Sequence, residues 1–95
     1  MVSLEQVNWD DVRVFLAVMR ANSLRQAAAG LGVSHPTVRR RLAALEEQVG
    51  LRLFDRHADG LHATAHAMAL IASAEDVERA MSGLKRAVLA ADPDL

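Results

Sequence analysis

The sequence predicts a mostly α-helical domain with three short helices, a two-stranded β hairpin and one long final helix. Its composition favours helices, because 52% of the 95 residues are hydrophobic and only 3% are aromatic, with alanine and leucine abundant. Helix-capping residues stand before three stretches in which apolar residues recur at helical spacing. A strand-like alternation and then a long heptad pattern occupy the second half of the chain.

The first helix is predicted to begin after Asn8 and to end near Ala21-Asn22. Asn8 is a good N-cap, and Asp10 and Asp11 put negative charge at the positive end of the helix dipole. Asn22 tolerates the left-handed conformation of a C-terminal cap. The apolar positions follow at i, i+3, i+4 and i+7, and they are Val12, Phe15, Leu16 and Met19.

The second helix is predicted to begin after Ser23, which forms a capping box with Gln26, and to end at Gly32. Gly30 lies inside it and costs about 1 kcal/mol relative to alanine, which indicates either close packing there or an early end of the helix. The packing face consists of Leu24, Ala27, Ala28 and Leu31.

The third helix is predicted between its cap, Ser34, and Gly50, with Pro36 in the first turn, where a missing N–H does no harm. Only Gly32 and Val33 separate it from the second helix. Two helices joined by a short turn that contains glycine, the second of them rich in arginine, are typical of a helix-turn-helix.

Three consecutive arginines lie on this third helix. Arg40 projects almost opposite the apolar stripe, Arg39 and Arg41 lie to either side, and small residues flank Arg40, so the helix backbone can approach another surface closely. Taken alone, the segment is equally compatible with a solvated surface helix. The stripe consists of Val38, Leu42, Leu45 and Val49.

The stretch after Gly50 predicts a β wing over residues 51–63. Leu51 and Leu53 alternate with Arg52, and Asp59-Gly60 suits a tight hairpin turn. The side chains predicted to face outward are cationic or protonatable, and they are Arg52, Arg56, His57 and His62.

A long helix is predicted from its cap, Thr64, to about residue 91, where Asp92-Pro93 stops it. A helix of about 40 Å is too long to lie entirely on a core of about 60 residues, so most of its apolar seam needs another surface. A homodimer contact is therefore favoured over packing of the whole helix on the chain's own core. The seam keeps an unbroken heptad spacing through Ala67, Leu70, Ala74, Val77, Met81, Leu84, Val88 and Ala91.

Positive charge is concentrated in the middle of the chain, although the formal net charge is −1 at pH 7. Residues 20–57 hold seven arginines against three acidic residues, giving +4, and both flanks are acidic. This gradient indicates an anionic partner for the middle segment.

Several classes of function are not supported by the sequence. Without cysteine, disulfides, cysteine-ligated zinc and thiol catalysis are excluded, and the four histidines form no metal-ligand pair within one predicted helix. The longest apolar run, residues 67–72, is far shorter than the ~20 residues of a membrane span, and no signal peptide is recognisable. With no activated nucleophile, phosphate-binding glycine loop or carboxylate pair, we expect neither an enzyme nor a cofactor.

The order of these motifs resembles the N-terminal DNA-binding region of LysR-type transcriptional regulators, over about residues 8–90. The resemblance includes FxAV in the first helix, SxP at the third cap, LE near the end of the third helix and GxxLFxR at the start of the wing. It implies a winged helix-turn-helix joined to a dimerising linker helix. The large effector-binding portion that normally follows in this family is absent from these 95 residues.

The resemblance assigns the family's base-reading positions to His35, Pro36 and Arg39, a backbone or groove contact to Arg40, and the wing arginine to Arg56. The family usually has Gln and Ser where His35 and Arg39 stand, so its usual base preferences do not carry over. An arginine at position 39 can pair bidentately with guanine in the major groove. The family's Leu-Thr-x-Ala-Gly appears as residues 63–67, with the cap kept and the small residues shifted.

The predicted DNA contacts divide into phosphate contacts and base contacts. We expect Arg40, Arg52 and Arg56 to supply most of the electrostatic affinity, and the first turns of the third helix to read bases. The full predicted set is Ser23, Arg25, Ser34, His35, Pro36, Thr37, Arg39, Arg40, Arg41, Arg52 and Arg56. The predicted dimer contacts are Ala67, Leu70, Ala74, Val77, Met81, Leu84 and Val88.

The leading hypothesis is a homodimer that binds double-stranded DNA and regulates transcription from the bacterial cytoplasm, at the nucleoid. Residues 1–63 form its DNA-binding domain, 64–91 its linker helix and 92–95 a tail. Recognition helix 35–48 lies in the major groove and wing 51–63 on the backbone or minor groove, with the two recognition helices about 34 Å apart. In the alternative, the chain heterodimerises with a full-length relative through the linker helix and modulates its DNA binding.

Overall fold

A computed structural model describes residues 2–91 of the chain. The predicted mostly α-helical fold, a winged helix-turn-helix followed by a long helix, is confirmed. The predicted helix stop at Asp92-Pro93 and the tail of residues 92–95 lie outside the described residues. The elements, in order, are η1 (Leu4–Gln6), α1 (Trp9–Ala21), α2 (Leu24–Leu31), α3 (His35–Val49), β1 (Phe54–His57), β2 (Gly60–Ala63) and α4 (Ala65–Ala91).

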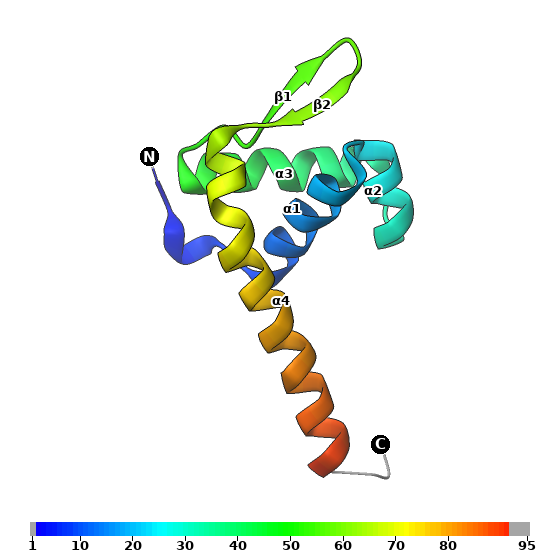
Figure 1. Ribbon diagram of the computed structural model, residues 1–95, viewed down its shortest axis with the longest axis vertical. Coiled ribbons are helices and arrows are strands. Elements are labelled where there is room, and N and C mark those ends of the chain that lie inside the picture. The colour runs from blue at the N-terminus through cyan, green and yellow to red at the C-terminus, as the bar shows by residue number, and fades with distance from the viewer. Residues whose placement is uncertain (1, 92–95) are drawn as a thin grey trace.

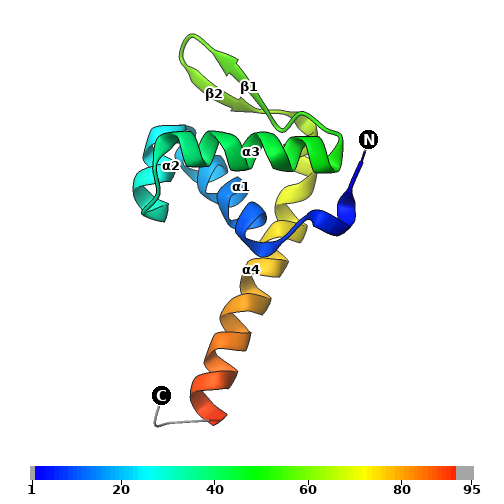
Figure 2. The same ribbon diagram turned by 180° about the vertical axis from the view of Figure 1, so that it is seen from behind.

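The first three helices form a head from which α4 extends as an arm (Figure 1). The β hairpin lies along one side of α3, and the second half of α4 runs away from the head. Seen from behind, the N-terminal segment lies near the end of α3 (Figure 2), where the Ser3 N–H donates to the Gln48 carbonyl at 2.6 Å. Within residues 2–91, no helix combines the length and apolar character needed to cross a membrane.

The predicted N-caps are all formed in the structure. At each of four helix starts, a side-chain oxygen accepts a hydrogen bond from the backbone N–H three residues later, at 3.0 to 3.2 Å. Replacing such a cap by alanine costs about 0.5–2 kcal/mol, so these side chains fix where the helices begin. The capping residues are Asn8, Ser23, Ser34 and Thr64.

Left-handed residues end the three short helices, as predicted. Asn22 has φ +54°, Gly32 has φ +71° and Gly50 has φ +72°. In this conformation the N–H of each residue turns back onto a carbonyl in the last turn of the preceding helix. The chain therefore leaves α2 abruptly, and α3 begins after only a short connection.

The hydrophobic core joins all three head helices to the wing and to the first half of α4. Leu53, at the base of the wing, is fully buried, and the rings of Phe15 and Phe54 lie with their centroids 6.0 Å apart. Ala67 and Ala74 of α4 belong to the same core. The core thus continues past residue 63 into the predicted linker helix.

The heptad seam of α4 is divided between two environments, which corrects part of the predicted dimer interface. Ala67 is 0% exposed in the chain's own core and offers no surface to a second chain in this arrangement, and Ala74 is only 8% exposed. Further along the same seam, Val77, Leu84 and Val88 are 40%, 57% and 47% exposed. Periodicity identified the seam but did not indicate which surface each half contacts.

The structure contradicts both explanations predicted for Gly30, close packing and an early helix end. Helix α2 continues past it to Leu31, and a Cβ built at Gly30 would meet nothing within 4 Å. Neither close packing nor an early helix end therefore accounts for this glycine. The structure offers no reason for its presence.

The hairpin turn lies one residue earlier than predicted. Because His57 pairs with Gly60 in the antiparallel register, the two-residue loop consists of Ala58 and Asp59. Gly60 begins β2 with φ +126°, a backbone conformation that L side chains rarely adopt.

Candidate nucleic-acid interface

One face of helix α3 is buried, and its arginines lie outside that face. Val38, Leu42 and Leu45 are buried, whereas Arg39 and Arg40 are exposed and Arg41 is half-buried. None of the three arginines pairs with a carboxylate within residues 2–91. Their guanidinium groups are therefore available to an external anion.

The start of α3 is ordered by two hydroxyl groups. Ser34 Oγ accepts from the Thr37 N–H at 3.2 Å, and Ser34 Oγ and Thr37 Oγ1 are 2.8 Å apart in a second hydrogen bond. Because the first N–H groups of a helix lack intrahelical partners, this end favours anionic ligands.

Arg39 and Arg56 face a groove that separates the helix-turn-helix from the wing. Its two adjoining parts have volumes of about 210 and 300 Å³. The first is lined by Arg39, Glu46, Arg52 and Arg56 together with apolar residues. Of these arginines, Arg39 and Arg56 also line the second part. The other predicted contacts that line the second part are Ser23, Arg25 and His35.

The strand register corrects the predicted orientation of Arg56. Arg56 pairs with Leu61, on the hairpin face that also carries buried Phe54. His57 and His62 lie on the opposite face, since side chains alternate along a strand. Arg56 is exposed, but it lies over the groove with Arg39 rather than beside the histidines.

The two histidines and Asp59 form a small cluster near the tip of the wing. The rings of His57 and His62 have centroids 4.4 Å apart, and His62 Nε2 lies 2.7 Å from Asp59 Oδ1. The hydrogen bond with the His62 imidazole lowers the pKa of Asp59 below its ordinary value of 3.8. Within the described residues, no group of three or more histidine, cysteine or acidic side chains is arranged to hold a metal ion.

Glu46 anchors the base of the wing to α3. Its Oε2 accepts from the N–H of Leu53 at 2.7 Å and from the N–H of Phe54 at 3.3 Å. On the other side of the hairpin, Thr64 Oγ1 donates to the Arg52 carbonyl at 2.7 Å, and the Thr64 N–H donates to the Leu53 carbonyl at 2.9 Å. The wing is thereby fixed to α3 and to the start of α4.

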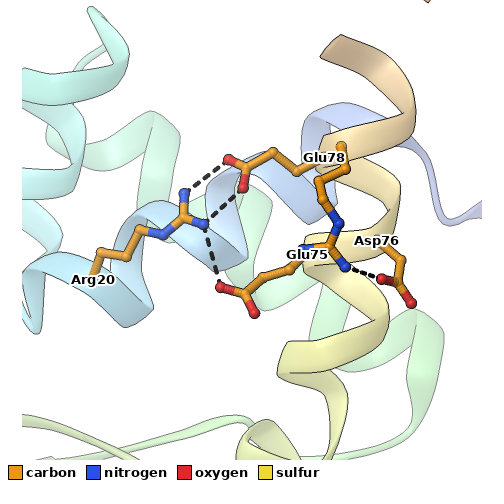
Figure 3. Close-up of polar contacts among 5 residues, drawn as sticks. Arg20, Glu75, Asp76 and Glu78 are labelled. Carbon is orange, nitrogen blue, oxygen red and sulfur yellow. Dashed lines mark hydrogen bonds and ion pairs between the residues drawn. The ribbon is translucent and has the colours of Figure 1, made fainter. Parts of the chain in front are cut away.

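An ion pair links the end of α1 to α4 (Figure 3). Both terminal nitrogens of Arg20 donate to the carboxylate of Glu78 at 2.8 Å, and Nη2 lies 3.7 Å from the Glu75 carboxylate. The hydrogen bonds from Arg20 lower the pKa of Glu78 below its ordinary value of 4.5, and Glu78 in turn raises the pKa of Arg20.

A family model described as bacterial regulatory helix-turn-helix protein, lysR family, matches residues 9–68, which span α1 to the start of α4. The chain belongs to the LysR family. This match confirms the resemblance to LysR-type regulators that the sequence motifs indicated. The family is one of transcription regulators, so this LysR-family domain is not an enzyme.

Known proteins similar to this LysR-family domain include regulators and solved DNA complexes. It is 44% identical to the transcriptional activator protein LysR of Escherichia coli K12, over 90% of this chain and 27% of that protein. The crystal structure of a CbnR DBD–DNA complex matches with a TM-score of 0.78 and 31% identity, covering 90% of this chain and 99% of that one. A complex of the BenM DBD with catB site 1 DNA matches with a TM-score of 0.74 and 26% identity, covering 86% and 97%.

The LysR-family domain brings together six of the predicted contact residues around the groove. The remaining five, Ser34, Pro36, Thr37, Arg40 and Arg41, lie along α3 outside the groove lining.

One ring nitrogen of His35, a predicted base-reading residue, is buried. Its Nε2 is buried and has no hydrogen-bond partner within residues 2–91, so this atom does not face a base in the present arrangement. Base reading by His35 therefore depends on Nδ1 or on a turn of the ring.

Sequence reasoning did not identify the positioning residues of this LysR-family domain. Glu46 contributed to the resemblance only as part of LE, and nothing in the local sequence connects it to the backbone of the wing. Arg20 and Glu78 are separated by 58 positions. Their only sequence signal is opposite charge, which many other pairs share.

Proposed function

We propose that the chain binds double-stranded DNA in a sequence-dependent manner as a homodimer and thereby regulates transcription. The observation that carries this proposal is the row of arginines on α3, which pair with no carboxylate among residues 2–91 and lie beside a capped helix start and a groove shared with a wing arginine. In this proposal α3 enters the major groove and the wing follows the backbone or the minor groove. A regulator of this kind acts in the bacterial cytoplasm, where the chromosome lies.

Different arginines contact different parts of the DNA in this proposal. Arg40 projects directly outward from α3, so it neutralises phosphate charge and releases counterions. Arg39 lies nearer the helix start and over the groove, where a guanidinium can pair with the O6 and N7 atoms of guanine. Arg52 and Arg56 bring the wing's positive charge to the same side of the molecule.

The comparisons support DNA as the anion. CbnR and BenM DBDs, covered to 99% and 97% by the match with this chain, were crystallised with DNA, and they share this fold at 31% and 26% identity. The chain spans 27% of the length of the E. coli regulator, and the proposal therefore names neither regulated genes nor an effector.

The second half of α4 supports the homodimer. Val77, Leu84 and Val88 remain exposed on one seam, and exposed apolar residues in register favour association of two helices. Beside Val77, an apolar groove of about 270 Å³ adjoins the seam, which enlarges the surface available to a second copy. It is lined by Leu4, Val7, Val12, Phe15, Leu45, Val49, Leu53, Leu70, Ser73, Ala74 and Val77.

Selection of bound sequences from a random pool of double-stranded DNA, at a fixed salt concentration, tests the proposal. Enrichment of two related half-sites supports it, whereas binding without any enriched sequence contradicts it. Sedimentation of the free chain checks the dimer, and a monomer at every concentration contradicts that part.

Two variants then separate base reading from phosphate binding. Arg39→Ala is expected to relax preference at one base position by about 1–3 kcal/mol, whereas Arg52→Ala weakens all sequences alike and reduces the salt dependence. Arg86→Ala removes the same charge from the second half of α4 and serves as the control. Equal losses for Arg39→Ala on selected and random DNA would show that Arg39 reads no base.

A further inference from the structure

The contact between Arg20 and Glu78 falls at the point where α4 leaves the head. Ala74 is the last residue of the described chain that belongs to the buried core, and Glu78 follows it by about one helical turn. From residue 79 to residue 91, α4 has no buried residue. The ion pair is thus positioned where the helix changes from a packed element to a free arm (Figures 1 and 3).

The geometry of this ion pair restricts direction as well as distance. Two hydrogen bonds of 2.8 Å join the planar guanidinium of Arg20 to the carboxylate of Glu78, and a bidentate pair of this kind fixes the relative orientation of both groups. Ala74, a small side chain, packs at the same level, and a methyl group does little to fix the angle at which a helix lies. Arg20 also lies two residues before Asn22, the left-handed residue that ends α1 and leads into α2 and α3.

A small change in the angle of the arm produces a large displacement at its end. The free part, residues 79–91, is about 20 Å long at 1.5 Å per residue. Rotation by about 10° at the ion pair therefore moves the far end by about 3.5 Å, close to the rise of one base pair of B-DNA. If two copies pair through their arms, the angle between arm and head sets the distance between the two recognition helices.

We propose that Arg20 and Glu78 are positioning residues that set which separation of DNA half-sites the homodimer prefers. This inference rests on the proposed function, since it requires a dimer that binds two half-sites. Partly exposed ion pairs contribute little to stability, so the pair acts mainly by selecting one direction of α4. Half-site recognition by α3 and the wing does not involve either residue.

The test measures binding to DNA that carries two selected half-sites with the spacer varied one base pair at a time, together with a single half-site. Arg20→Gln and Glu78→Gln break the pair while keeping side chains of similar size, and the double variant Arg20→Glu/Glu78→Arg reverses it. Asp76→Asn is the matched control, because Asp76 pairs with Arg79 on α4 itself and not with the head. Affinities come from fluorescence anisotropy at one salt concentration, and circular dichroism checks that each variant is folded.

Wild type and Asp76→Asn are expected to share one preferred spacer. In Arg20→Gln and Glu78→Gln, the preference for that spacer over its neighbours falls by about two- to fivefold, with unchanged affinity for the single half-site. The reversed pair restores the preference.

Two results overturn the inference, and they are distinguishable from failure of the proposed function. Single variants that keep the wild-type spacer preference show that the pair sets no distance. Single variants that lose affinity for the lone half-site to the same extent show that the pair supports the head instead. A wild-type chain that stays monomeric or has no preferred spacer refutes the dimeric function and this inference together.

Discussion

Replacing Glu46 by alanine is expected to detach the wing from α3. The substitution removes the acceptor for two backbone N–H groups, one of them on fully buried Leu53. A hydrogen bond to a charged group contributes about 1.5–3 kcal/mol, and a buried donor left unpaired costs about 1–3 kcal/mol. The 2.7 Å bond to Leu53 supplies most of the effect, and the 3.3 Å bond to Phe54 supplies less. We therefore expect a loss of about 2–4 kcal/mol in the free energy of unfolding.

Urea denaturation of wild type, Glu46→Ala and Glu46→Gln at one protein concentration measures this effect. The amide oxygen of Gln keeps an acceptor at the same position, so Glu46→Gln is expected to lose about 1 kcal/mol, much less than the alanine variant. Fixed concentration is required because the proposed dimerisation would contribute to apparent stability. If Glu46→Ala unfolds within 0.5 kcal/mol of wild type, about the scatter of ordinary surface substitutions, the anchoring role is refuted.

Three further predictions concern other parts of the chain. Gly30→Ala is expected to stabilise the protein by about 0.5–1 kcal/mol, because the added methyl meets nothing and alanine favours the helix; a lowered melting temperature would contradict this. Leu84→Glu is expected to weaken the proposed dimer by about two to four orders of magnitude, since two copies each lose about 1.5–3 kcal/mol of burial. Ser82→Glu, on the opposite face of α4, is expected to have little effect in sedimentation. Acid is expected to break the ion pair between Arg20 and Glu78. Because the pKa of Glu78 is lowered in the folded state, the ion pair contributes fully to the free energy of unfolding above the ordinary pKa of 4.5. This contribution is lost as the pH falls through the lowered pKa. Wild type is therefore more stable than Arg20→Gln near neutral pH and equally stable once the carboxylates are protonated, and a difference that persists in acid would exclude this ion pair as its source.

Local signals account for the parts of the fold that the sequence predicted correctly. Each cap acts within three residues of its own position, and Asn22, Gly32 and Gly50 end helices through their own backbone conformation. Helix and strand periodicity likewise depend on neighbouring residues. These features identified the four α-helices and the wing, but not the short 3-10 helix η1 at Leu4–Gln6.

Features that depend on tertiary contacts were missed or misassigned. Arg56 was grouped with His57 and His62, but the register places it on the other face of the hairpin, because strand alternation defines two faces without indicating which one packs on α3. The seam of α4 shows the same limit, since Ala67 and Val77 share one spacing but have different surroundings. Glu46 bonds to backbone N–H groups seven and eight residues away, across a change from helix to strand that no periodicity spans.

The hydroxyl of Thr64 has two partners that belong to different functions. It caps α4 by accepting from the Ala67 N–H, and it also donates to the carbonyl of Arg52 in the wing. A shift of the wing backbone against a phosphate strand therefore displaces the oxygen that holds the first turn of the arm. The position of the wing and the first turn of α4 thus depend on the same oxygen atom. Thr64→Val keeps the shape of the side chain but removes this oxygen, so it is expected to weaken the attachment of the wing and that of the arm together.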